Sequence, residues 1–210
     1  MKWTQLPLGP LQTNAYILIN DQKECLVFDP GSEGEALNTY LEEKSWKPLA
    51  ILLTHAHFDH IGAVDAVRDR WGIPVYLHKK EKEWLMNPSL NGSQFFQLGA
   101  IKAGPADILI KEEGKLKISN FELDILFTPG HSPGSVSYYH AKEKLVFAGD
   151  ALFAGSIGRT DLPGGNHDQL IRSIHDKLLS LPEETTVLSG HGMTTTIEKE
   201  MDSNPFLNGF

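Results

Sequence analysis

Histidine and aspartate side chains are concentrated in one short stretch, from Thr54 to His60, which reads Thr-His-Ala-His-Phe-Asp-His. Imidazole and carboxylate groups are the usual protein ligands of zinc, iron and manganese. His55 and His57 alternate in what should be an extended segment, so their side chains converge on one point. Asp59 and His60 lie where the chain turns into a helix and can face a second point nearby. Burying four such groups without partners would be unfavourable, and the cluster therefore predicts a metal site.

Three further candidate ligands follow predicted strands later in the chain: His131, Asp150 and His191. Each is flanked by glycine, which lets the backbone turn sharply and bring the side chain into a crowded centre. Considered alone, each histidine would more often be a surface or core residue, and the aspartate a turn residue, but the cluster from Thr54 to His60 changes that balance. Five histidines and two carboxylates suffice for two metals with four protein ligands each, if Asp150 bridges them. The histidines outside this pattern are predicted to have no metal role: His78, His140, His167 and His175.

The elements that must position these side chains alternate between strands and helices. Two β-rich runs around a polar turn predict a hairpin over 15–29. Ser32 is expected to cap a helix that continues to Lys44, and the apolar run 49–53 predicts a strand buried on both faces. The other elements predicted up to residue 104 are a helix over 61–71 that Gly72 ends, a strand at 74–77, a helix over 79–86 and a long irregular excursion over 87–104.

The second half of the chain resembles the first in outline, which hints at a duplicated α/β unit. Its strand candidates are 115–118, 121–127, 135–139, 145–147 and 186–188. An amphipathic helix is predicted over 167–180 and a final helix over 194–201. No linker or low-complexity segment divides the sequence, so a single domain over 1–210 is expected.

Composition narrows the function. The chain has 210 residues and a formal net charge of −8, which disfavours broad capture of nucleic acid. The first residues lack the apolar region of a signal peptide, and no apolar run approaches the roughly 20 residues of a membrane helix. Cys25 is the single cysteine, so a cytosolic protein is expected, with Cys25 as a small core residue rather than a nucleophile. No nucleic-acid or membrane partner is predicted.

The sequence resembles the metallo-β-lactamase superfamily and, within it, the compact glyoxalase II-like hydrolases. The resemblance runs from Asn14-Ala15-Tyr16 and Phe28-Asp29-Pro30-Gly31, through the His-x-His-x-Asp-His signature at 55–60, to His191-Gly192. It implies an α/β fold, a four-layer αββα sandwich with the metals at one edge, and Asp29 as a support for the ligands. The implied ligand sets are His55, His57, His131 and Asp150 for one metal, and Asp59, His60, His191 and Asp150 for the other.

The sequence also departs from glyoxalase II itself. It ends soon after His191, so the C-terminal helical domain that helps to bind glutathione is expected to be missing. Arg159 stands near the position of a thiol-binding lysine and could bind a substrate carboxylate in bidentate fashion. Met193 stands where that family has a tyrosine. The stretch 158–161, Gly-Arg-Thr-Asp, is typical of the compact proteins and also resembles the persulfide dioxygenases, which use a single iron.

The predicted activity is hydrolysis of thioesters of small thiols, such as S-lactoylglutathione. Two divalent ions, with zinc favoured over iron or manganese, would lie roughly 3–4 Å apart and provide a bridging hydroxide. Asp59 and Asp150 are the predicted catalytic residues, and the expected partner is a small-molecule thioester. A persulfide dioxygenase and a lactonase remain alternatives. A β-lactamase, an RNA nuclease and a non-catalytic metal-binding module are disfavoured.

Overall fold

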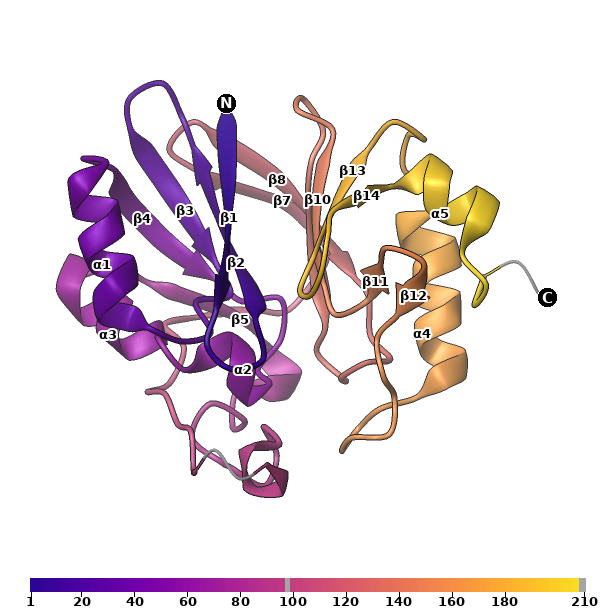
Figure 1. Cartoon of the computed structure of the whole chain (residues 1–210), viewed down its shortest axis with the longest axis horizontal. Coiled ribbons are helices and arrows are strands. Elements are labelled where there is room, and N and C mark those ends of the chain that lie inside the picture. The colour runs from indigo at the N-terminus through magenta and orange to yellow at the C-terminus, as the bar shows by residue number, and fades with distance from the viewer. Residues whose placement is uncertain (97–98, 208–210) are drawn as a thin grey trace. The chain divides into compact units, whose positions relative to one another are not determined.

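The computed structural model describes residues 1–96 and 99–207. Parts of the predicted excursion 87–104 and of the predicted domain 1–210, namely residues 97–98 and 208–210, lie outside the described residues. The chain forms two compact units, 1–111 and 112–210, and each contains one six-stranded sheet (Figure 1). The prediction of a single domain remains a prediction. No helix within the described ranges is long and apolar enough to cross a membrane.

The sheet of the first unit keeps its strands in sequence order. They are β1 (Lys2–Leu8), β2 (Thr13–Ile19), β3 (Glu24–Phe28), β4 (Lys47–Leu52), β5 (Val75–His78) and β6 (Ile108–Ile110). The first two pairings are antiparallel, which confirms the hairpin of β2 and β3, and β3 to β6 are parallel. Because parallel strands end at the same edge of a sheet, the segments after β3, β4 and β5 emerge side by side. Asp29, His55 and Glu81 lie on these segments.

Three helices accompany this sheet: α1 (Gly34–Glu43), α2 (Phe58–Ile61) and α3 (Val64–Trp71). Figure 1 shows α1 and α3 side by side on one face of the sheet. Alternate strand residues such as Ile17 and Val27 pack with Leu37 and Val67 of these helices in one buried cluster. Asn38 donates a hydrogen bond to the Ala66 carbonyl oxygen over 3.0 Å, which ties α1 to α3.

Three predictions about these helices need correction. Ser32 does not cap α1: Glu33 is the N-cap, in a left-handed conformation with φ 56°, and its carboxylate accepts from the Gly9 N–H. The predicted helix 61–71 is split into α2 and α3, because Gly62 and Ala63 lie between them. Gly72 ends α3 as predicted, with φ 63°. The predicted helix over 79–86 is only a 3₁₀ turn over Lys79–Glu81, followed by turns, and a second 3₁₀ turn spans Ser93–Phe95.

The second unit orders its sheet β14-β13-β10-β9-β8-β7. These strands are β7 (Gly114–Ile118), β8 (Phe121–Phe127), β9 (Val136–His140), β10 (Leu145–Gly149), β13 (Thr186–Ser189) and β14 (Thr195–Thr196). A small hairpin, β11 (Leu152–Phe153) and β12 (Ser156–Ile157), follows β10. The pairings give β8, β10 and β13 the same direction, so their carboxyl ends share one edge. His131, Asp150 and His191 follow these three strands.

Two helices belong to the second unit, α4 (His167–Ser173) and α5 (Ile197–Ser203) (Figure 1). A π-helical segment, Ile174–Leu178, continues α4, so the helix predicted over 167–180 is confirmed with a changed final turn. The helix predicted from 194 begins three residues later, because Thr195 and Thr196 pair with β13 instead. Buried Glu200 accepts from the Thr195 hydroxyl and the Gly155 N–H, which ties α5 to the hairpin of β11 and β12.

Cys25 lies in β3 and is fully buried, as expected of a core residue. Burial raises the pKa of its thiol to about 12. We therefore expect native protein at about pH 8 to react negligibly with an aromatic disulfide reagent, and one thiol per chain to react in denaturant. The measurement is absorbance of the released thiolate over time. Equally fast reaction in both conditions would show that the thiol is accessible.

Candidate metal centre

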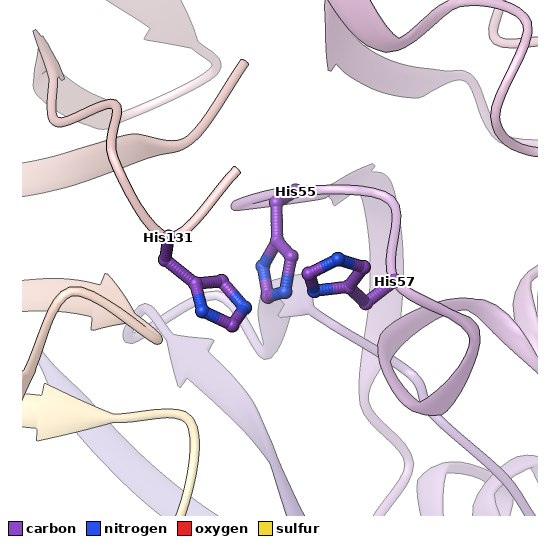
Figure 2. Close-up of side chains that lie close together, drawn as sticks. All are labelled: His55, His57 and His131. Carbon is purple, nitrogen blue, oxygen red and sulfur yellow. The ribbon is translucent and has the colours of Figure 1, made fainter. Parts of the chain in front are cut away.

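Three imidazole rings of the first unit lie close together after β4. The ring centroids of His55 and His57 are 4.8 Å apart, and those of His55 and His60 are 4.1 Å apart. Figure 2 shows the first two rings turned toward each other on the loop that follows β4, and it also labels His131, which belongs to the second unit. All three rings of the first unit are buried. The alternation predicted for His55 and His57 therefore brings them together, with His60 beside them.

Asp29 is hydrogen-bonded to the segment that carries these rings. Its Oδ1 accepts from the Thr54 N–H over 2.7 Å, and its Oδ2 accepts from the Thr54 hydroxyl over 2.6 Å. Nδ1 of His60 lies 3.0 Å from the same Oδ2. Asp29 itself is buried and has a left-handed backbone with φ 46°. It thus contacts the ligand-bearing segment at three atoms, which is how outer carboxylates orient metal-binding histidines.

These bonds determine which nitrogen of each ring carries the proton. An ionised carboxylate only accepts, so Nδ1 of His60 donates to Asp29. The single hydroxyl proton of Thr54 goes to Asp29, so its oxygen accepts from Nδ1 of His55, 3.0 Å away. In both rings Nε2 then carries the lone pair. The two histidines are held in the tautomer that a metal ion requires.

Asp59 lies in the first turn of the short helix α2, beside His60. Its Oδ2 accepts from the Thr13 hydroxyl over 2.8 Å and lies 3.5 Å from Nε2 of His60. The second distance is longer than a hydrogen bond. Two ligand atoms at about 2.1 Å from one tetrahedral metal are roughly 3.4 Å apart. The spacing of Asp59 and His60 therefore suits two ligands of one cation.

Glu81 and Trp84 support the same loop and were missed in the sequence. Glu81 is fully buried, and its carboxylate accepts from the Ala56 N–H over 2.7 Å. Ala56 stands between His55 and His57, so this bond fixes the backbone that carries both rings. The ring centroids of Trp84 and His57 are 5.6 Å apart. The signal available in the sequence was a glutamate directly after a strand parallel to the one that carries the histidines.

In the second unit, one oxygen of Asp150 lies near two imidazoles from different loops. Its Oδ2 is 3.6 Å from Nε2 of His131 and 3.5 Å from Nε2 of His191. Nδ1 of His131 donates to the Arg159 carbonyl oxygen over 2.7 Å, which again leaves Nε2 as the lone-pair nitrogen. An oxygen at similar distances from two imidazole nitrogens has the position that a bridging ligand needs.

Two glycines of the second unit are required by close contacts. A Cβ at Gly158 would lie 1.8 Å from the Asp150 carbonyl oxygen and 3.2 Å from Nδ1 of His131. A Cβ at Gly130 would lie 2.2 Å from the backbone nitrogen of Leu170, and its φ is 136°. Gly130 is one of the glycines expected to allow a crowded centre, because it flanks His131; Gly158 flanks no predicted metal ligand in the sequence.

Arg159 is exposed, and its guanidinium forms two hydrogen bonds of 2.7 Å with the carboxylate of Asp161. The same contact holds the pKa of the Asp161 carboxyl at about 2, so the pair is ionised at neutral pH. The side chain predicted to bind a substrate carboxylate is thus engaged with a carboxylate of the chain. Its role in substrate binding stays a prediction.

The four histidines outside the pattern have other surroundings. His78 and His140 are buried, and burial lowers the pKa of both rings, that of His78 to about 4. His167 begins α4, and His175 is exposed on the π-helical segment. Within the described part of the chain, none of the four belongs to a group of three or more metal-ligating side chains.

The donor set fits a divalent metal. The imidazoles of His55, His60 and His131 present Nε2 with Nδ1 already donating, which suits transition metals such as zinc, iron and manganese. The carboxylates of Asp59 and Asp150 lie at ligand–ligand spacing from histidine nitrogens of their own unit. Each unit therefore contains side chains of metal-ligating type at ligand–ligand spacing.

Comparison with known proteins identifies relatives along the whole chain. The family described as the metallo-beta-lactamase superfamily matches residues 8–191. The chain is 61% identical over 210 residues to the probable metallo-hydrolase YqgX of Bacillus subtilis, covering 100% of this chain and 99% of that protein. It is 38% identical over 204 residues to the hydroxyacylglutathione hydrolase GloC of Haemophilus influenzae, covering 97% and 96% of the two chains.

Solved structures agree with these matches. The chain resembles the crystal structure of the B3 metallo-β-lactamase BLEG-1 with a TM-score of 0.97 and 60% identity, over 99% of this chain and 100% of that one. It resembles TTHA1623, solved in a di-iron-bound form, with a TM-score of 0.85 and 40% identity, over 97% and 100% of the two chains. The predicted α/β fold class is confirmed by these likenesses.

Proposed function

Because this metallo-hydrolase belongs to the metallo-β-lactamase superfamily, we propose that it hydrolyses thioesters of small thiols, in the manner of a compact glyoxalase II. The observation that carries the proposal is the position of Asp150 Oδ2, at similar distances from Nε2 of His131 and of His191. Similarity to the Haemophilus influenzae hydroxyacylglutathione hydrolase, at 38% identity, supports the thioester as substrate class.

We propose two metal positions that share Asp150. The remaining ligands of the first are His55, His57 and His131, and those of the second are Asp59, His60 and His191. Zinc is the proposed metal. Iron is the main alternative, because the similar protein TTHA1623 was solved in a di-iron-bound form, and manganese accepts the same ligand types.

When bound, the cations would supply a water with a pKa near neutrality and a Lewis acid for the thioester carbonyl. The chain's own residues position the reactants. Asp59, held by the Thr13 hydroxyl, orients the attacking water through its carboxylate. The thiol leaves as a thiolate, whose conjugate acid has a pKa of about 8.5, so a strong general acid is unnecessary. Arg159 binds a carboxylate of the thiol, for which it must exchange its contact with Asp161.

The proposed partner is a small-molecule thioester, and the net charge of −8 offers no broad attraction for nucleic acid. We place the reaction in the cytosol, because a single cysteine, Cys25, suits a reducing compartment.

Metal content and turnover on one sample test the proposed function. We expect about two metal ions per chain and cleavage of S-lactoylglutathione, and we expect Asp150→Ala to lose at least one ion and about 100-fold or more in kcat/KM. Asp202→Ala, at an exposed position of α5, is the matched control and should retain both. Chelator treatment should abolish turnover, and zinc should restore it. Full turnover by metal-free protein would refute the proposal.

A second candidate is β-lactam hydrolysis, which the 60% identity with the B3 metallo-β-lactamase BLEG-1 favours. It would use the same ligands and the same attacking water. A chromogenic cephalosporin assayed beside the thioester separates the two activities. Lactone cleavage would identify a lactonase. One iron per chain with oxygen uptake on glutathione persulfide would identify a dioxygenase.

A further inference from the structure

The first unit contains a pocket of about 190 Å³ beside Asp59. Its walls come from the loop between β1 and β2, the segment after β3, the start of α2 and the excursion that follows β5. The lining residues are Leu8, Gly9, Pro10, Leu11, Thr13, Gly31, Ser32, Phe58, Asp59 and Ile101. We propose that this pocket binds the acyl group of the substrate and selects apolar acyl groups of four to six carbons over short hydroxyacyl groups. The proposal rests on the proposed thioesterase function.

The lining chemistry favours an uncharged, apolar occupant. Leucine, proline, phenylalanine and isoleucine account for five of the ten lining residues, and Asp59 is the one ionisable residue among the ten. The lining residues include no cationic side chain, so the pocket offers no ion-pair partner for the carboxylates of a thiol such as glutathione. The thiol therefore has to lie elsewhere, and the acyl side of the thioester is left to enter this pocket.

The position of Asp59 connects the pocket to the reaction. Asp59 is a proposed ligand and water-orienting group, and Oδ2 is the atom that lies 3.5 Å from Nε2 of His60. Phe58, the residue before it, contributes an aromatic wall to the same pocket. An acyl chain in the pocket would thus begin beside the carbonyl carbon that is attacked.

The volume sets the preferred chain length. A volume of 190 Å³ corresponds to about six water molecules at roughly 30 Å³ each. A methylene group is of similar size, so a chain of four to six carbons fills the space. The three-carbon lactoyl group would leave about half of this volume empty.

The pocket is preformed. Gly9 donates its N–H to the Glu33 carboxylate over 2.8 Å, and Gln12 closes a turn onto the Gly9 carbonyl oxygen through its N–H and its side-chain amide. A Cβ at Gly9 would lie only 2.7 Å from that of Ser32, so the loop packs closely against the segment after β3. Fixed walls discriminate between chain lengths because they cannot adjust to a poor fit.

The test is a series of thioesters that share one thiol and differ in the acyl group: acetyl, lactoyl, butyryl, hexanoyl and decanoyl. For the wild-type holoenzyme we expect kcat/KM for hexanoyl to exceed that for lactoyl by about tenfold or more, from burial of the added methylenes. Ile101→Trp should fill the pocket and bring this ratio near one. Ile108→Trp, at an exposed position of β6, is the control and should leave the ratio unchanged.

A second variant and a binding measurement make the result independent of folding and of turnover. Leu11→Ala, at an exposed position, should shift the optimum toward longer chains. Hexanamide binding, followed by NMR, should occur in wild type and be lost in Ile101→Trp. Hexanamide binding without thioester cleavage would refute the proposed function but support the assignment of an apolar binding pocket. Cleavage with equal rates for lactoyl and hexanoyl, unchanged by Ile101→Trp, would overturn the inference alone.

Discussion

Replacing Asp29 by asparagine should lower the affinity of the protein for metal by about 10–100-fold, as loss of an outer ligand support typically does. The asparagine side chain would keep one accepting oxygen. Its NH₂ group, however, would face the Thr54 hydroxyl or the His60 Nδ1–H, which both donate to Asp29 in the wild type. Asparagine tolerates the left-handed backbone of this position, so the effect would come from the side chain. Chelator competition measures the affinity.

The cobalt-substituted protein gives a second readout, because the visible absorption of Co²⁺ reports ligand geometry. We expect a changed spectrum in Asp29→Asn and an unchanged one in Asp21→Asn, which alters an exposed turn residue between β2 and β3. Unfolding of the metal-free variant should also require about 1–3 kcal/mol less free energy, since a buried hydrogen-bonded carboxylate is lost. Wild-type affinity and spectrum in Asp29→Asn would contradict the assigned role.

Gly158→Ala should destabilise the second unit and reduce activity together. The new Cβ would lie 1.8 Å from the Asp150 carbonyl oxygen, so the backbone of a proposed bridging ligand must move. A displacement of about 1 Å at such a site costs on the order of 100-fold in kcat/KM. The loss of unfolding free energy should be about 3 kcal/mol, as for other overpacked positions. Thermal unfolding and thioester turnover measure the two effects.

Gly155→Ala is the matched control, because it lies nearby, in the hairpin of β11 and β12. Its φ of 69° is left-handed, but a Cβ there would meet no described atom within 4 Å. The left-handed backbone should cost this variant only about 1–2 kcal/mol of unfolding free energy, and turnover should be retained. If both variants behaved alike, the close approach at Gly158 would not matter for the metal ligands.

Much of the fold was predictable because periodicity is local. The hairpin of β2 and β3, the buried strand β4 and the amphipathic α4 all follow from runs of apolar residues. The errors arose where distant residues decide local structure. Glu33, at the start of α1, has a left-handed backbone and accepts a hydrogen bond from the Gly9 N–H. The edge strands β1 and β6 were missed, because β1 carries several exposed residues and β6 has only three.

The candidate ligands could be predicted from the sequence, but most residues that hydrogen-bond the ligands or their backbone could not. The cluster from Thr54 to His60 is visible in the sequence because its members are neighbours. Asp29 was found only through a resemblance. Glu81 and Thr13 hydrogen-bond residues 25 and 46 positions away, and nothing in one sequence links such pairs. The parallel pairing of β4 with β5 brings Glu81 near Ala56, and the antiparallel pairing of β2 with β3 brings Thr13 to the same edge. Only the structure shows these pairings.

The closed turn at Gly9 and Gln12 has a kinetic consequence. A loop that is already hydrogen-bonded on both sides has no opening step to wait for, so the entry of an acyl group should be governed by diffusion and desolvation. Little conformational entropy would be lost when the group enters. Short and long acyl groups should therefore enter at similar rates, and their selection should appear as different residence times.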